Sequence, residues 1–333
     1  MYHHRRARRT QGTRRLGVRA ALGVAGLVAA CVAAMSPSAA LASADPPGQG
    51  PAPAPANAPV PHTHAHNDYL HDHPLFDALS HGFDSVESDI WLADNGVLVA
   101  DPLLVGHTKA ALQHGQTIQD LYLDPLLALT STNASGHVYA GSTAQVTLLV
   151  DVKSDASSTY AVLDTLLRTP KYAPMLTSWT KTGANSWTTQ LGPVRVLISG
   201  NRDRATMTSQ PQRYAAYDGR LSDLFTTLPT PGIPPVLVSQ LPAASFMPLI
   251  SQSWSSVFAW HGTGAMPADQ QATLATIMSA AHANGQEIRF YGTPDRSGTQ
   301  YLAVWAAEAA AGVDWLNTDM LAELQAFLFS NPY

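Results

Sequence analysis

Residues 64–69 read His-Ala-His-Asn-Asp-Tyr, and residues 83–92 read Phe-Asp-Ser-Val-Glu-Ser-Asp-Ile-Trp-Leu. Each stretch joins an apolar run to charged or titratable side chains near its end. Charged groups beside buried strands are costly unless they are paired or bind a cation. Because strands that end side by side deliver such groups to one point, the two stretches predict a divalent metal site next to an acid–base histidine.

Apolar runs alternate with amphipathic runs along the rest of the chain, which indicates repeated strand–helix units. The predicted strands are 61–66, 83–90, 145–152, 194–199, 214–218, 257–260, 287–291 and 313–317. The predicted helices are 75–81, 156–167, 202–209, 268–284, 299–311 and 320–329. Eight strands with interleaved helices favour an α/β fold of the TIM (β/α)8 barrel type, whose functional residues lie at strand carboxyl ends. A doubly wound open sheet is the alternative.

Residues 1–44 have the composition of a secretory signal peptide. Arginines crowd positions 5–19, an apolar run follows over 20–35, and Ala42-Ser43-Ala44 forms a small-residue cleavage site. The run is shorter than the roughly 20 residues that span a bilayer, so we expect a secreted protein without a stable membrane span. Both the Sec and the Tat routes stay open, and lipoprotein anchoring at Cys31 is a less favoured alternative. Residues 45–61 are a Pro/Ala-rich linker. Residues 62–333 remain, a length that suits one large α/β domain or barrel.

The charge after the signal peptide is strongly negative. All 24 acidic residues lie beyond residue 44, against 12 lysines and arginines. This balance argues against a nucleic-acid partner, which requires a basic surface. Cys31 is the only cysteine, so the domain has no disulfide and its stability depends on burial and on a bound metal. We expect a monomer.

Glu87 and Asp89 are two residues apart on a predicted strand and therefore face the same side. Two such carboxylates repel each other unless a cation lies between them or one is protonated. A further acid–lysine pair, Asp151 and Lys153, ends the apolar run 147–150. Oxygen ligands favour Mg²⁺ or Ca²⁺ over zinc. The alternatives are a solvent-facing strand edge for the first pair and an ordinary ion pair for the second.

His66 is the candidate proton-transfer group for two reasons. It lies near a predicted strand end, and an imidazole is the side chain that most readily exchanges a proton near neutral pH. His64 shares its face and is either a second ligand or a packed neighbour. His107 follows the run Leu-Leu-Val-Gly at 103–106, which could form a hairpin with 97–100. A histidine there could protonate a leaving group, and a surface histidine is the alternative.

Five motifs in this order carry a resemblance to a known superfamily: HAHNDY (64–69), HGFDSVESDIWL (81–92), LLVGH (103–107), LLVDVKSD (148–155) and GVDWLNTD (312–319). Together they resemble the phosphatidylinositol-specific phospholipase C-like and glycerophosphodiester phosphodiesterase superfamily, in a bacterial secreted branch related to altered inheritance of mitochondria proteins. The resemblance spans residues 64–329. It implies a TIM barrel and metal-assisted cleavage of a small-molecule or lipid phosphodiester by two histidines.

The resemblance assigns roles to individual positions. His66 and His107 match the two histidines, and Lys153 matches the lysine of the Glu-x-Lys motif. Glu87 and Asp89 match the metal carboxylates, and Asp151 stands where the superfamily usually has glutamate. Two departures accompany this match. Residues 97–102 are inserted before His107, and an alignment without the insertion would lose that histidine. The glutamate of a Pro-Glu-Asn stretch is missing, and Asn67 is its possible replacement.

The expected reaction is attack on a phosphodiester by water or by a substrate hydroxyl, with one divalent cation, Mg²⁺ or Ca²⁺, on the three carboxylates. Four residues near strand ends are candidates for substrate binding: Asn67, Trp260, Arg289 and Tyr291. Two rival functions remain. His64-x-His66 with Asp319 also fits an amidohydrolase-like metal hydrolase, although residues 138–260 contain no histidine. A non-catalytic binding protein on the same barrel is the other rival, motivated by the insertion before His107.

Overall fold

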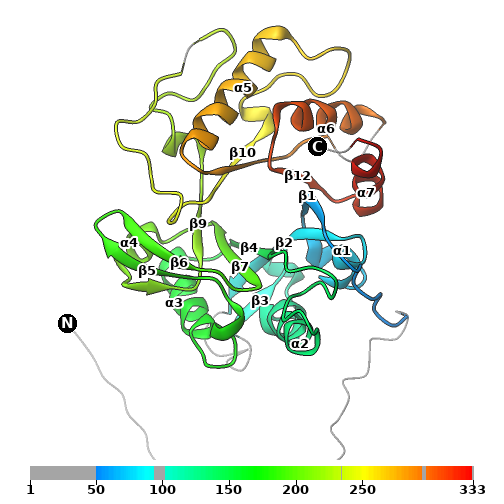
Figure 1. The fold of residues 1–333 in the computed structure, drawn as a ribbon, viewed down its shortest axis with the longest axis vertical. Coiled ribbons are helices and arrows are strands. Elements are labelled where there is room, and N and C mark those ends of the chain that lie inside the picture. Colours follow the sequence, from blue (N-terminus) through cyan, green and yellow to red (C-terminus); the bar gives the residue numbers. More distant parts are fainter. Residues whose placement is uncertain (1–49, 94–101, 234, 295–297, 332–333) are drawn as a thin grey trace, which may run out of the picture. The chain divides into compact units, whose positions relative to one another are not determined.

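The computed structural model describes residues 50–93, 102–233, 235–294 and 298–331 (Figure 1). The predicted signal peptide, the start of the linker, and residues 97–101 of the predicted insertion lie outside these ranges. No helix within the described residues is long and apolar enough to cross a membrane.

Eight parallel strands form a closed ring in the order β1, β12, β11, β10, β9, β7, β4 and β2, and the pairing of β1 with β2 closes it. This closure confirms the TIM barrel and excludes the open sheet. The strands are β1 (Val60–Ala65), β2 (Phe83–Leu92), β4 (Val146–Val152), β7 (Val194–Gly200), β9 (Ala216–Gly219), β10 (Leu249–Ser253), β11 (Glu287–Tyr291) and β12 (Trp315–Thr318). A short antiparallel strand, β3 (Leu103–Val105), pairs with the end of β2.

Seven α-helices accompany the barrel in the described residues. They are α1 (Phe76–Ser80), α2 (Asp124–Thr132), α3 (Ala156–Leu167), α4 (Arg204–Ser209), α5 (Ala268–Ala283), α6 (Gln300–Ala311) and α7 (Leu321–Ser330). All six predicted helices are present, with ends within about two residues of the prediction, as expected for helix boundaries. Helix α2, which follows a π-helical turn over Gln119–Leu123, was not predicted. Its proline near the first turn is compatible with a helix start.

The predicted strand over 257–260 is wrong. The strand at this position of the barrel is β10, and residues 254–256 form a single 3-10 turn after it. The apolar run 257–260 instead belongs to an aromatic cluster. Phe258 lies 4.4 Å from Trp254 and 5.6 Å from Phe290 between ring centroids, and the Trp254 indole donates to the Trp260 carbonyl. These residues are apolar because they are buried in a loop, and a short buried loop has the same apolar composition as a buried strand.

Two further features differ from the sequence prediction. A second sheet of three antiparallel strands, β5 (Ser178–Gly183), β6 (Ser186–Gln190) and β8 (Gln212–Arg213), lies outside the barrel. The end of the predicted linker also contacts the barrel, since the Ala56 amide donates to the Leu79 carbonyl and the Gly141 amide donates to that of Asn57. Contacts with the barrel are thus already made before residue 62, and β1 starts at Val60.

Strand alternation turns charged side chains into the barrel. Arg195 on β7 reaches across to Glu287 on β11 with two hydrogen bonds of 3.1 and 2.8 Å, and its guanidinium stacks on Trp315 at 5.2 Å. These residues fill the amino-terminal half of the interior. The imidazole of His64 stacks on the same Trp315, 5.6 Å between ring centroids. The interior above this layer is therefore left for the polar side chains near the carboxyl ends of the strands.

Glu308 on α6 provides a test of the packing outside the barrel. Its side chain is fully buried and neither carboxyl oxygen has a hydrogen-bond partner in the described structure. Burial raises the pKa of Glu308 well above its ordinary value, so folding takes up a proton. The stability linked to this group is present at low pH and is lost as the pH rises toward the folded-state pKa. We expect Glu308→Gln to raise the free energy of unfolding at alkaline pH by about 1–3 kcal/mol.

Thermal unfolding followed by circular dichroism from about pH 4 to about pH 9 measures this effect. The increase in the free energy of unfolding of Glu308→Gln over the parent protein should become smaller toward acid pH. Glu323→Gln on the exposed face of α7 is the matched control and should leave the pH dependence unchanged. Parallel curves for the parent and Glu308→Gln would contradict the prediction.

Candidate active site

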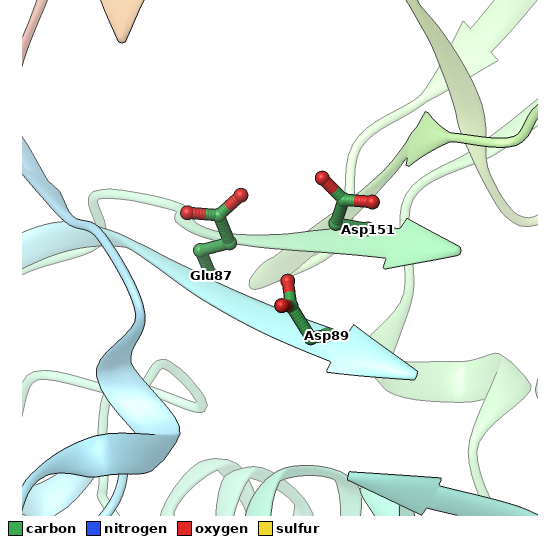
Figure 2. A group of neighbouring side chains, drawn as sticks. All are labelled: Glu87, Asp89 and Asp151. Atoms are coloured by element: carbon green, nitrogen blue, oxygen red, sulfur yellow. The ribbon is translucent and has the colours of Figure 1, made fainter. Parts of the chain in front are cut away.

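Three carboxylates meet at the carboxyl ends of β2 and β4. Glu87 and Asp89 come from β2, Asp151 from β4, and the register pairs Asp89 directly with Asp151. One oxygen from each lies within 4.8 Å of the others, and Figure 2 shows the three groups directed toward a common point. The structure thus brings together the three predicted metal carboxylates.

Their surroundings make the three carboxylates electrostatically unequal. Burial opposes ionisation of Glu87, but the charge of Arg289 and a contact with His64 outweigh it and hold its pKa well below the usual range. Burial and the charge of Glu87 raise the pKa of Asp89. Burial and Glu87 also raise that of Asp151 to about 6, although Lys153 acts in the opposite direction. The site therefore has an excess of negative charge.

Lys153 offsets part of this charge, because its ammonium lies 3.2 Å from both Asp89 Oδ2 and Asp151 Oδ2. A formal count shows what remains. Around the site, Glu87, Asp89, Asp151, Asp218 and Asp319 face the cations Lys153, Arg220 and Arg289. Before any charge on His66 or His107 is counted, two negative charges are left uncompensated.

An oxygen ligand set with this charge fits one divalent cation such as Mg²⁺ or Ca²⁺. The buried Oδ1 of Asp151 supports the fit, since it has no hydrogen-bond partner in the described structure. Asp89 Oδ2 is occupied by Lys153, Tyr69 and His107. Asp89 Oδ1, Asp151 Oδ1 and Glu87 are the oxygens that could hold the cation.

His66 is oriented by a residue from the far end of the chain. Its Nδ1 lies 2.7 Å from Asp319 Oδ1, and a carboxylate can only accept, so Nδ1 donates. Its Nε2 lies 3.7 Å from Glu87 Oε2. Burial lowers the pKa of His66, but the hydrogen bond to Asp319 and the charge of Glu87 outweigh it and raise the pKa overall. The imidazole is thus held with Nε2 available for proton exchange.

Asn67 and Tyr69 fix the loop that follows β1. Asn67 has a left-handed backbone with φ 49°, a conformation that asparagine tolerates better than most residues. Its backbone N–H donates to Glu87 Oε2 at 3.4 Å. The Tyr69 hydroxyl donates to Asp89 Oδ2 at 2.7 Å, and its pKa is raised by burial and by Asp89. Tyr69 therefore stays protonated and holds Asp89 in place.

His107 lies just after β3 and contacts both Asp89 and this loop. Its Nδ1 is 3.1 Å from Asp89 Oδ2 and 3.3 Å from the Tyr69 hydroxyl, and its side chain is 61% exposed. Because Asp89 accepts from Nδ1, Nε2 is the nitrogen that can exchange a proton. The predicted insertion has not removed this histidine from the site.

His64 lies beneath the site as a buried, neutral group. Its Nδ1 is 2.7 Å from Ser85 Oγ and its Nε2 is 2.5 Å from Arg289 Nη1. Burial and the charge of Arg289 lower its pKa to about 4. Since both ring nitrogens are engaged, His64 is a packed neighbour and not a second ligand.

These groups line a cavity of about 400 Å³. Predicted residues in its wall are His66, Asn67, Glu87, Asp89, His107, Asp151, Lys153, Arg289 and Tyr291. Trp260 is not among them, which corrects its predicted role in substrate binding. It lies in the aromatic loop after β10, and its indole donates to the carbonyls of Thr263 and Gly264. The error follows from the wrongly placed strand.

Sequence analysis missed four residues of the site: Tyr69, Ser199, Arg220 and, as the partner of His66, Asp319. Ser199 lies near the end of β7, and Arg220 directly follows β9. Both side chains contact Asp218. Position at a strand end was a usable signal for Ser199. Asp319 lies 2.7 Å from His66 only because β12 pairs with β1, a contact that no local pattern predicts.

Comparison with known proteins finds a family model and several relatives that resemble this chain. Residues 56–218 match the family model of the AIM6-like phosphodiesterase domain. The chain is 30% identical to altered inheritance of mitochondria protein 6 of Lachancea thermotolerans over 78% of its length, and 28% identical to that of Eremothecium gossypii over 78%. The matches cover 63% and 68% of those relatives, so the chain spans about two thirds of their length. A homologue from Arthroderma benhamiae is 28% identical and is covered over 79%.

A weak structural likeness connects the chain with a solved enzyme. Phosphatidylinositol-specific phospholipase C from Listeria monocytogenes aligns with a TM-score of 0.40 and 10% identity, over 85% of this chain and 96% of the other. The family match and the relatives confirm the resemblance to altered inheritance of mitochondria proteins that the motifs indicated. They do not support the bacterial branch, because these relatives are fungal.

Gly200 supplies a test of the carboxylate geometry. It has φ +64°, and a Cβ at this position would overlap Asp151 Oδ1 and the Val152 backbone. We expect Gly200→Ala to displace Asp151 and to weaken binding of Mg²⁺ or Ca²⁺ by about 10–100-fold, the range for residues that support metal ligands. Isothermal titration of the purified protein with each cation measures the change.

Gly136→Ala is the matched control. Gly136 has a similar φ of +69° but nothing within 4 Å of an added Cβ, so it carries the backbone strain without the collision. Its cation affinity should equal that of the parent. Equal affinities for parent, control and Gly200→Ala would show that Asp151 Oδ1 has no part in cation binding.

Proposed function

We propose that this chain is a metal-dependent phosphodiesterase that cleaves a small-molecule or lipid phosphodiester by histidine acid–base catalysis. The observation that carries the proposal is the convergence of Glu87, Asp89 and Asp151 in one cavity with two separately oriented histidines. The AIM6-like phosphodiesterase match, which contains His66, His107 and all three carboxylates, supports the same reaction class.

Glu87, Asp89 and Asp151 would hold one Mg²⁺ or Ca²⁺. When bound, this cation neutralises phosphoryl oxygen charge and makes a coordinated hydroxyl easier to deprotonate. Lys153 remains protonated, because Asp151 and Asp89 raise its pKa against the effect of burial. Its ammonium, at the mouth of the same cavity, adds a second positive charge for the phosphoryl group.

Proton transfer falls to the two histidines. His66, with Nδ1 bonded to Asp319, accepts the proton of the attacking hydroxyl at Nε2. His107 would enter this step with both ring nitrogens protonated; Nδ1 stays bonded to Asp89, and Nε2 gives its proton to the leaving oxygen. The two rings follow different strands, β1 and β3, and line the same cavity, so one can serve attack and the other departure at one phosphorus. Asp319 acts as a positioning residue for His66.

The rival functions are less well supported. An amidohydrolase-like site needs His64 as a ligand and Asp319 as a free acid, but both His64 nitrogens and the Asp319 carboxylate are engaged. A non-catalytic binding protein was suggested by the insertion before His107, yet that ring lines the cavity. We also propose that residues 1–44 direct export of the protein, which we expect to be a monomer.

Metal dependence is the first test. We expect the purified protein to cleave at least one member of a panel of glycerophosphodiesters and phospholipids, to lose this turnover with a chelator, and to regain it with Mg²⁺ or Ca²⁺. The reason is that the side-chain cations of the cavity leave an excess of negative charge, which repels an anionic substrate until a bound divalent cation offsets it. Undiminished turnover after complete chelation would refute the metal, and no turnover on any phosphodiester would favour the binding protein.

Histidine substitution is the second test. His66→Ala and His107→Ala should each lower turnover by about 10²–10⁴-fold while leaving cation affinity nearly intact, since neither ring is a proposed ligand. His137→Ala is the control, because that ring contacts the Ser135 carbonyl of its own turn and does not line the cavity. Turnover is measured at saturating cation. Full activity of His107→Ala on a substrate with a poor leaving group would move the general acid to another residue.

A further inference from the structure

The connection from β9 to β10 exposes an unusual group of apolar side chains. Its members and their exposed fractions are Leu228 (39%), Ile233 (61%), Val236 (61%) and Leu237 (48%). The other large exposed apolar residues of the described structure are single and dispersed along the chain: Leu70, Leu191, Leu302 and Phe329. A cluster of this kind marks a surface that contacts a partner.

Backbone hydrogen bonds organise this segment as a hairpin, which we call the apolar hairpin (residues 224–233 and 235–238). The Val238 amide donates to the Leu224 carbonyl, that of Thr226 to Val236, and that of Ile233 to Thr230. Prolines at 229, 231 and 235 carry no amide hydrogen. The hairpin therefore presents apolar side chains with few unpaired backbone donors, which is the requirement for entering a lipid phase.

The apolar hairpin begins at the rim of the catalytic cavity. It starts four residues after Arg220, which lines that cavity at the carboxyl end of β9. Figure 1 shows the connection as a long yellow-green loop; its described residues contain one 3-10 turn (Leu221–Asp223) and no α-helix. Leu70, 64% exposed, belongs to the same face, because it follows β1 and adjoins Tyr69 of the site.

Charge indicates which partner fits. Residues 224–248 contain no aspartate, glutamate, lysine, arginine or histidine. A protein partner of complementary charge would find no counterpart here. An anionic membrane requires basic residues near the surface, and the chain after residue 44 has twice as many acids as bases. An uncharged apolar segment instead matches a lipid surface without net charge, into which it would insert as interfacial segments do.

We infer that the apolar hairpin docks the barrel on a zwitterionic lipid surface, with Ile233 and Val236 inserted at the acyl boundary and the catalytic cavity facing the headgroups. This inference deepens the proposed function, on which it rests for the reaction, by selecting a lipid phosphodiester as the substrate class. Docking itself requires no turnover.

Sedimentation of the full chain with phosphatidylcholine vesicles tests the inference. We expect the parent to bind, and the double variant Ile233→Ser/Val236→Ser to partition at least about tenfold more weakly, because two apolar side chains no longer enter the bilayer. Both positions are exposed, so the barrel should keep its thermal stability. Adding an equal amount of phosphatidylglycerol should weaken binding.

Leu191→Ser and Phe329→Ser are the matched controls. Both residues are more exposed than Ile233, at 78% and 69%, but Leu191 precedes β7 and Phe329 ends α7, so they lie toward the opposite end of the barrel. Their binding should equal that of the parent. The inference is overturned if the parent does not bind phosphatidylcholine vesicles, if the control substitutions weaken binding as much as the double variant does, or if binding requires anionic lipid.

Two further measurements separate this inference from the proposed function. Size-exclusion chromatography would show a dimer that the double variant converts to monomer if the hairpin instead binds a second copy, which would overturn the lipid surface. Turnover of a water-soluble glycerophosphodiester should be equal in the parent and the double variant, whereas turnover on vesicles should fall with binding. Vesicle binding without turnover on any phosphodiester would uphold docking and refute the proposed function.

Discussion

The contact between the Arg289 guanidinium, His64 and Glu87 inside the barrel is the constraint on which the rest of the site depends. Arg289 is 2% exposed, and its Nη1 lies 2.5 Å from His64 Nε2 and 3.7 Å from Glu87 Oε2. A buried carboxylate without such a partner would take up a proton. Arg289 keeps Glu87 ionised, and Glu87 in turn makes ionisation of Asp89 and Asp151 unfavourable. One buried cation thus creates the demand for a second positive charge at the cavity.

The two ends of the barrel interior serve different purposes. Toward the amino-terminal end, Arg195 and Glu287 neutralise each other and Trp315 fills the space between strands. Toward the carboxyl end, negative charges outnumber positive ones, and two carboxylate oxygens, Asp151 Oδ1 and Asp218 Oδ1, lack a hydrogen-bond partner in the described structure. Concentrating like charges lowers stability, and functional sites commonly carry such a cost. The neutral, well-packed layer beneath offsets it, which explains how a domain without cysteines can hold five acidic side chains around one cavity.

Local patterns predicted much of the site and less of its support. The spacing of Glu87 and Asp89 on one strand, and the acid after the next apolar run, were sufficient for the three carboxylates, because strand alternation and parallel pairing are local rules. The partner of His66 could not be found this way, since Asp319 lies at the other end of the domain and meets it only through the β1–β12 pairing. The strand at 257–260 was misplaced for a related reason. A buried aromatic loop has the same apolar composition as a buried strand. The structure distinguishes the two, because β10 occupies the barrel position and Phe258 packs on Trp254 after it.

The bond between His66 and Asp319 joins the first and the last strands of the barrel. A chain emerging from a ribosome or a translocation pore presents His66 long before Asp319. Until β12 docks on β1, the ring has no fixed tautomer and the carboxylates have no closed wall behind them. Completion of the barrel and orientation of the imidazole are therefore a single event. The unfinished chain carries the reactive residues without their alignment, so that the timing of folding determines when they can act together.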